Sequence, residues 1–236
     1  MTTPVLTRYG DVERTIAEAV DRWFRRGPFF RALGAGVLER PALRYFAVQY
    51  GHYSRHFPRI LGAAIAAAEG DAAWWVPLAD NLWDEAGRGV PGHTHQDLYR
   101  TFLVSVDPEA DLDREPMGPG VRRAVDRFLR FFRRATPLDA VAGVGLGSEL
   151  FAGTVMAWIR DGLAHPHYQT PRPLDLRFWH VHVTVDEPRH YALLRGILAA
   201  HDTPEELARM AAVGLKLARW EAVMYTDIWR ESRRLV

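Results

Sequence analysis

Residues 178–194 read FWHVHVTVDEPRHYALL, and this stretch places His182, Asp186 and His190 at intervals of four residues. Side chains four residues apart project from one face of an α-helix. Two imidazoles and a carboxylate on one face are suitable ligands for a divalent iron, manganese or zinc ion. The stretch therefore predicts a helix with a metal-binding face.

Most of the remaining chain has the same helical periodicity, and no hairpin pattern, βαβ pattern or internal repeat interrupts it. The expected helices span residues 11–25, 41–70, 71–85, 94–106, 121–134, 138–163, 174–200 and 204–233. Residues 107–120 and 165–173 are rich in turn-forming residues and are expected to be loops. A chain of 236 residues fits one domain, so the sequence predicts a single all-α bundle of seven to eight helices over residues 1–236.

Composition excludes several classes of function. The 30 basic and 29 acidic residues leave a net charge of +1, so no general attraction to nucleic acid or anionic membrane is expected. The absence of cysteine excludes disulfides, thiolate ligands, iron–sulfur clusters and a cysteine nucleophile. The N-terminus lacks a signal-peptide pattern, and the apolar stretch 60–68 is too short to span a bilayer. We therefore expect a soluble cytoplasmic protein that binds a small-molecule substrate.

Glu149 stands out because it is an acid in a mostly apolar helical run, GLGSELFAGT at residues 145–154. The nearest charged residues are Asp139 and Arg160. Charged side chains are rarely buried unless they are paired or bind a metal. Glu149 is thus a candidate metal ligand, and a buried salt bridge is the alternative interpretation.

A third group of polar residues follows Asn81, where Glu85 ends one expected helix and His95 begins the next after a glycine-rich turn. A helix–loop–helix corner of this kind can aim both side chains into the bundle. Taken alone the pattern is weak, because Asp84, Glu85 and His93 are also typical of solvated loops and helix caps.

Together the three groups supply three carboxylates and three imidazoles from four helices. The candidate ligands are Glu85, His95, Glu149, His182, Asp186 and His190. Helix bundles build dinuclear carboxylate sites from acids and histidines that point inward from facing helices. Six oxygen and nitrogen ligands without sulfur suit two iron or manganese ions better than one structural zinc ion.

This arrangement resembles the haem-oxygenase-like diiron oxidases and oxygenases. The resemblance extends from about residue 41 to residue 194. It rests on NLWDEAGRG at 81–89 leading to His95, on Gly-Ser-Glu at 147–149, and on the helix of His182 and Asp186. It implies a haem-oxygenase-like helical fold and a labile diiron centre, with ligands carried over to Glu85, His95, Glu149, His182 and Asp186.

One position departs from the pattern of that family, which closes with a histidine three residues after the aspartate. Here the third residue after Asp186 is Arg189, and His190 comes one later. Both directions lie within about 60° of Asp186 on an ideal helix, and Pro188 permits a local bulge that re-aims His190. We favour His190 as the last ligand. The alternative is that this ligand is lost and Arg189 serves the substrate.

The resemblance implies an oxygen-dependent enzyme with two Fe(II) ions, or manganese, that oxidises a small amino-acid-derived or fatty-acid substrate through a peroxo-diferric intermediate. Its reactions would be N-oxygenation, desaturation or carbon–carbon cleavage, in a specialised-metabolite pathway. Other members of the broad fold fit less well. Thiaminase-like relatives need a cysteine that this chain lacks, haem oxygenases need a proximal histidine on an early helix, and the cofactorless quinone-forming oxidase of pyrroloquinoline quinone biosynthesis does not need the three acids together.

Substrate contacts are expected from the second long helix. Gln49, His56 and Arg59 are spaced to share a face, and an arginine there would anchor a substrate carboxylate. A solvated face is the alternative interpretation. The expected C-terminal helix is amphipathic, which indicates core packing or a homodimer interface. The rival class of function is a metal-degenerate or cofactorless helical protein that binds a small molecule without turnover, or one that holds a single structural zinc ion.

Overall fold

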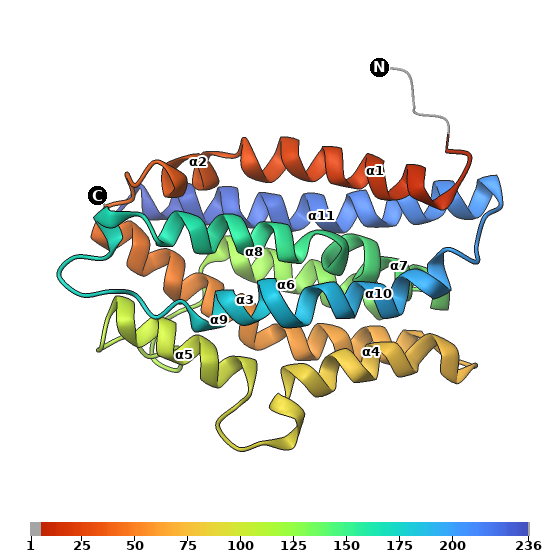
Figure 1. The fold of residues 1–236 in the computed structure, drawn as a ribbon, viewed down its shortest axis with the longest axis horizontal. Coiled ribbons are helices and arrows are strands. Elements are labelled where there is room, and N and C mark those ends of the chain that lie inside the picture. The colour runs from red at the N-terminus through yellow and green to blue at the C-terminus, as the bar shows by residue number, and fades with distance from the viewer. Residues whose placement is uncertain (1–5, 236) are drawn as a thin grey trace.

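The computed structural model describes residues 6–235, except for the side chains of residues 185–188. Within that range the regular structure is helical and includes no strand, and the helices lie alongside one another in an elongated bundle (Figure 1). The helices are α1 (Tyr9–Val20), α2 (Pro28–Gly34), α3 (Arg40–Ala67), α4 (Ala72–Glu85), α5 (His95–Val106), α6 (Pro119–Phe132), α7 (Pro137–Val144), α8 (Leu150–Leu163), α9 (Arg177–Val181), α10 (Glu187–Leu198) and α11 (Pro204–Ser232). The predicted all-α bundle is confirmed.

Three short π-helical segments extend or join these helices. Asp21–Arg25 continues α1, Gly145–Glu149 joins α7 to α8, and His182–Asp186 joins α9 to α10. The described residues thus form nine helical rods, one more than the largest number predicted. The helix absent from the sequence prediction is α2, which follows Gly27-Pro28, a pair that is typical of the end of a helix. Proline is equally favoured at the first position of a new helix, which is its place in α2.

The C-terminal helix α11 packs against four other helices of the bundle, α1, α3, α6 and α7. Leu207, Met210, Ala211 and Met224 are buried along it, so the predicted core packing is confirmed. A close approach of α11 to the chain at Gly147 requires a glycine, since a Cβ there would lie 2.7 Å from Cβ of Leu217. This contact holds the segment that carries Glu149 against α11. The homodimer stays a prediction.

The α7–α8 run, Pro137–Leu163, is long and apolar enough to cross a membrane by length and composition. However, 61% of its most apolar window is buried inside the bundle, so core packing accounts for its apolar character. The run carries Glu149, which is 3% exposed, into the middle of the molecule.

Candidate metal centre

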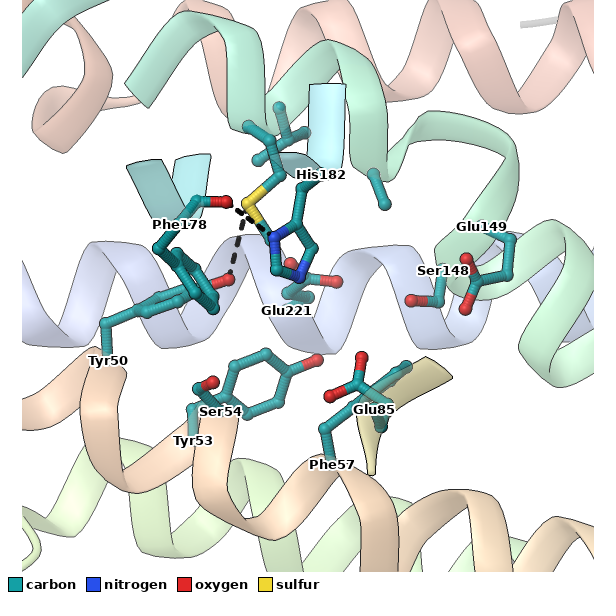
Figure 2. A pocket seen from close by; sticks show the side chains of 13 residues that line it. Tyr50, Tyr53, Ser54, Phe57, Glu85, Ser148, Glu149, Phe178, His182 and Glu221 are labelled. Atoms are coloured by element: carbon teal, nitrogen blue, oxygen red, sulfur yellow. Dashed lines mark hydrogen bonds between the residues drawn. The ribbon is translucent and has the colours of Figure 1, made fainter. Parts of the chain in front are cut away.

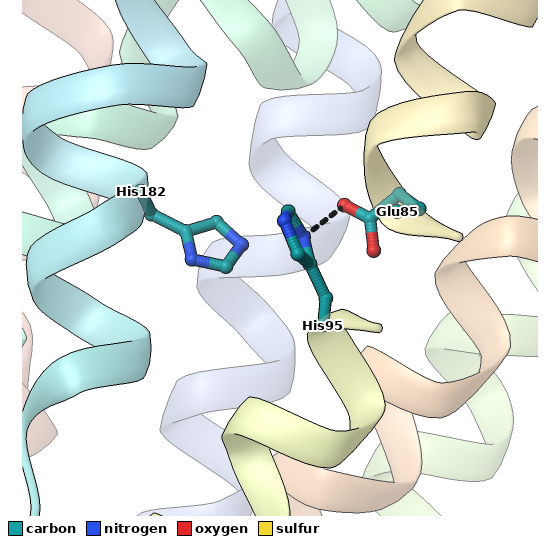
Figure 3. Close-up of side chains that lie close together, drawn as sticks. All are labelled: Glu85, His95 and His182. Carbon is teal, nitrogen blue, oxygen red and sulfur yellow. Dashed lines mark ion pairs between the residues drawn. The ribbon is translucent and has the colours of Figure 1, made fainter. Parts of the chain in front are cut away.

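Three of the predicted ligands meet in the interior. One ligand atom from each of Glu85, His95 and His182 lies within 4.8 Å of the others, and all three side chains are buried (Figure 3). Nδ1 of His95 is 3.0 Å from Oε1 of Glu85. Neighbouring ligand atoms on an octahedral ion with bonds of about 2.1 Å are separated by about 3 Å. The group therefore has the composition and spacing of a two-histidine, one-carboxylate metal site.

His182 presents a defined nitrogen to this group. Its Nδ1 atom is 2.7 Å from the carbonyl oxygen of Phe178, one turn earlier on the same helix (Figure 2). A carbonyl only accepts, so Nδ1 carries the proton and donates it. Nε2 then keeps its lone pair, which is the arrangement in which a histidine binds a metal.

The α4–α5 corner positions the other two members of the group. Gly87 has a φ of +64°, and a Cβ there would lie 2.5 Å from the backbone of His93, so only glycine fits. Thr94 and Asp97 then form a capping box that starts α5 directly at His95. The chain reverses within a few residues, and the last residue of α4 and the first of α5 face each other.

A second pair of predicted ligands, Glu149 and His190, lies close together in the core. Oε2 of Glu149 is 3.6 Å from Nδ1 of His190, and both side chains are 3% exposed. The amide of Asn81 donates a hydrogen bond of 2.9 Å to Oε1 of Glu149. Asn81 therefore orients Glu149. The alternative interpretation, a buried salt bridge, has one candidate partner among the described residues, His190, and this pair is ionic only if the imidazole is protonated.

Asp84 is a buried carboxylate, although its place in the sequence is also typical of a solvated loop or a helix cap. Its Oδ2 atom is 2.9 Å from Nε2 of His190 and also accepts a hydrogen bond from Arg189, while Oδ1 pairs with Arg88 at 2.6 Å. Arg189 also binds Asp80. Asp84 thus holds the proton on Nε2 of His190 and leaves the lone pair on Nδ1, the atom nearest Glu149.

The π-helical segment His182–Asp186 explains why His190 and not Arg189 reaches the interior. A π-helical turn contains an extra residue relative to an α-helical turn. The eighth residue after His182 therefore takes the direction that the seventh would have on an uninterrupted α-helix. Pro188, which has no N–H for the backbone ladder, follows the segment. The bulge expected from the sequence is present, and Arg189 points to the two aspartates of α4.

The side chain of Asp186, the middle member of the predicted series, lies outside the described residues. Its place in the ligand set stays a prediction. The described members of the set form one group of three residues and one neighbouring pair.

A cavity adjoins the group. Its volume is about 40 Å³, room for a few water-sized molecules, and its wall includes Glu85, Glu149 and His182 (Figure 2). Apolar side chains make up much of the rest: Phe57, Ala152, Val155, Met156 and Phe178. Tyr53 from α3 and Glu221 from α11 also line it. Burial raises the pKa of Tyr53 well above 10, so its hydroxyl stays protonated.

The residues predicted to bind substrate lie elsewhere. Gln49 is buried, but it donates to the carbonyl of Pro116 and accepts from the N–H of Gly118, so it fastens the loop before α6. His56 is half-buried and bonds to the carbonyl of His52. Arg59 is exposed, and Arg189 is bound to Asp80 and Asp84. None of the four lines the cavity beside the metal-ligand group.

Glu221 is the cavity residue that the sequence analysis missed. It lies four residues after Leu217 and four before Tyr225, both buried, so it occupies the apolar stripe of α11. An acid on such a stripe is a signal of a buried polar residue, although it is weaker than at Glu149 because Lys216 and Arg219 lie close by in the sequence. Burial, and next the charge of Glu149, raise the pKa of Glu221 to about 8.

Known proteins of this architecture are similar to the chain in sequence and in fold. A pyrroloquinoline-quinone synthase from Cereibacter sphaeroides is 28% identical over 190 residues, which cover 79% of this chain and 72% of the relative. A protein of the same name from Ectopseudomonas mendocina is 33% identical over 129 residues, 54% of this chain and 50% of the relative.

Solved structures share the fold at low sequence identity. A CADD-like protein of unknown function from Nostoc punctiforme superposes with a TM-score of 0.79 at 17% identity, over 95% of this chain and 98% of the other. A domain of unknown function with a haem-oxygenase-like fold from Shewanella denitrificans gives 0.75 at 16% identity, over 96% and 94%. A TenA homologue from Pyrococcus furiosus gives 0.70 at 12% identity, over 94% and 99%.

A family model described as iron-containing redox enzyme matches residues 44–221. This segment contains Glu85, His95, Glu149 and His182, together with the cavity whose wall includes three of them, Glu85, Glu149 and His182. The chain therefore belongs to the iron-containing redox enzymes with a haem-oxygenase-like fold.

Proposed function

We propose that this protein is an O2-dependent non-haem diiron oxidoreductase that acts on a small organic substrate. The observation that carries the proposal is the buried group of Glu85, His95 and His182 beside a cavity. Two histidines and one carboxylate with open coordination positions are the ligand set of many non-haem iron oxygenases.

The first ion would be held by this group, with Nε2 of His182 as one donor because Nδ1 is bound to the carbonyl of Phe178. The second would be held by Glu149 and by Nδ1 of His190, with Asp186 as the expected third ligand. Asn81 and Asp84 fix the orientation of Glu149 and His190. Bound iron would supply the redox chemistry and the reaction with oxygen.

Other side chains around the proposed metal site shape it and make its surroundings apolar. Phe178 packs against the rings of His95 and His182, with centroids 6.4 Å and 4.2 Å apart, and covers one side of the group. Phe57, Val155 and Met156 make part of the cavity wall apolar. Burial raises the pKa of Tyr53 well above 10, so its hydroxyl keeps its proton and can donate a hydrogen bond to a bound substrate.

A second candidate function is the oxidative formation of a quinone without a bound metal. It is favoured by the similarity to the Cereibacter sphaeroides protein named pyrroloquinoline-quinone synthase, at 28% identity. Such an enzyme has no need of the ligand arrangement around His182. Iron binding therefore separates the two candidates.

The experiment is an anaerobic titration with Fe(II), with the iron bound per chain measured after gel filtration. We expect about two irons in the wild type and a loss of about one in His182→Ala. His180→Ala is the matched control, because His180 is an exposed histidine on the same helix. A wild type without iron, or a His182→Ala variant with full iron, would contradict the diiron proposal.

A further inference from the structure

Glu221 is a buried carboxyl group for which the described residues supply no neutralising partner. The residue is 7% exposed and comes from α11, and Figure 2 draws its carboxyl beside the cavity near His182. Within the described part of the chain, no side chain forms a hydrogen bond or an ion pair with it. A carboxylate without a partner in a low-dielectric interior is strongly disfavoured.

Glu221 is also separate from the metal-ligand group. The donor atoms of Glu85, His95 and His182 cluster within 4.8 Å, and Glu221 does not belong to that cluster. The protein thus places a third carboxyl group at the cavity, in addition to Glu85 and Glu149. In the proposed function, iron ions would bind Glu85 and Glu149. Glu221 then remains to contact any other molecule that enters the cavity.

The rest of the lining indicates the charge of that ligand. Among the described residues of the wall there is no arginine or lysine, so nothing is placed to receive a carboxylate or phosphate. The aromatic residues Tyr50 and Phe178 line the same wall, and the faces of aromatic rings attract cations. Aliphatic side chains form the rest of the wall, which suits a ligand with a small apolar part.

We propose that Glu221 is the counter-ion of a substrate that carries an ammonium group on a small apolar body. The inference rests on the proposed function, because it takes the cavity beside the metal-ligand group as the substrate site. It runs against the sequence-based expectation that an arginine anchors a substrate carboxylate. The raised pKa of Glu221 fits this role, since an arriving cation favours the charged carboxylate that burial alone disfavours.

The test compares three probes of equal chain length on the Fe(II)-loaded protein without oxygen: butylammonium, 1-butanol and butyrate. Calorimetric titration at neutral pH gives the dissociation constants. We expect butylammonium to bind at least tenfold more tightly than the other two. Butyrate or butanol that binds as tightly as butylammonium would overturn the inference. This comparison uses only the wild type, so it does not depend on the folding of a variant.

Glu221→Gln is the second arm, because the amide keeps the shape and removes the charge. We expect it to keep its iron and to lose at least tenfold in affinity for butylammonium. Glu205→Gln, at an exposed glutamate on the same helix, is the control and should change neither. Loss of iron in Glu221→Gln alone would make Glu221 a metal ligand and overturn the inference.

The two proposals fail in different ways. A wild type that binds no iron but still binds butylammonium through Glu221 would contradict the diiron function and support the ammonium site. A wild type with two irons and no preference for butylammonium would support the diiron function and contradict the ammonium site.

Discussion

Nε2 of His190 lies 2.9 Å from Oδ2 of Asp84, and the two side chains are 3% and 6% exposed. Asp84 also binds Arg189 and Arg88, so one carboxylate gathers three cationic or protonated groups. The contact sets the tautomer of His190 and turns Nδ1 toward Glu149. Asp84, whose place in the sequence is also typical of a solvated loop, thus orients a ligand of the proposed second iron site.

Asp84→Asn tests this orienting role. We expect the affinity for the second iron to fall by about 10–100-fold, the usual effect of losing an outer hydrogen-bond partner of a metal ligand. The first iron should bind as before. Asp80→Asn is the control, because Asp80 binds Arg189 but not His190. Equal effects of both substitutions in an Fe(II) titration would contradict the role assigned to Asp84.

The π-helical register predicts which residue closes the ligand set. His190→Ala should lose about one iron per chain, and adding Arg189→His should not restore it. A histidine at position 189 would point to Asp80 and Asp84 instead of Glu149. Recovery of the second iron in the double variant, measured by iron analysis after anaerobic loading, would show that position 189 faces the site.

Gln49 is predicted to act on stability and not on substrate. Gln49→Ala leaves the buried N–H of Gly118 without its acceptor, so we expect a loss of about 1–3 kcal/mol in the free energy of unfolding. Iron content should not change. Arg59→Ala, at an exposed position of the same helix, should stay within about 0.5 kcal/mol. Urea denaturation measures both, and an unchanged midpoint for Gln49→Ala would refute the structural role.

The buried Glu221 predicts that the stability of the metal-free protein depends on pH. Its pKa is raised from 4.5 to about 8 in the folded state, mainly by burial. Above pH 4.5 the unfolded chain releases this proton while the folded chain keeps it, so stability is lost as the pH rises toward about 8. Glu221→Gln has no such proton.

The free energies of unfolding of Glu221→Gln and wild type should therefore diverge by about 1.4 kcal/mol per pH unit in that window, with the variant the more stable. Urea denaturation of chelator-treated protein across the window measures the divergence. Parallel curves for the two proteins would show that Glu221 is not buried as described.

Much of the fold followed from helical periodicity, since amphipathic helices such as α5 and α11 carry their apolar stripe in the sequence. The α4–α5 corner was also readable, because the glycines and the capping residue Thr94 have local conformational requirements. The short helix α2 was not, because Gly27-Pro28 marks both an end and a beginning.

The candidate site was predictable where a polar residue interrupts an apolar run, as Glu149 does. Its partners depended on tertiary packing. Spacing alone could not show that Asp84 turns inward, or that a π-helical segment moves the ligand position from 189 to 190. Glu221 carries a weaker signal, because Lys216 and Arg219 lie close to it in the sequence and make a solvated position equally plausible there. Spacing also could not show that Gln49 contacts the loop before α6, so the substrate role of its helix face stays a prediction.

The most direct test of the diiron centre is anomalous scattering at the iron edge from crystals of the Fe(II)-loaded protein. We expect two peaks, one among Glu85, His95 and His182 and the other beside Glu149 and Nδ1 of His190. A single peak, or iron bound only at the surface, would contradict the diiron centre on which the proposed function rests.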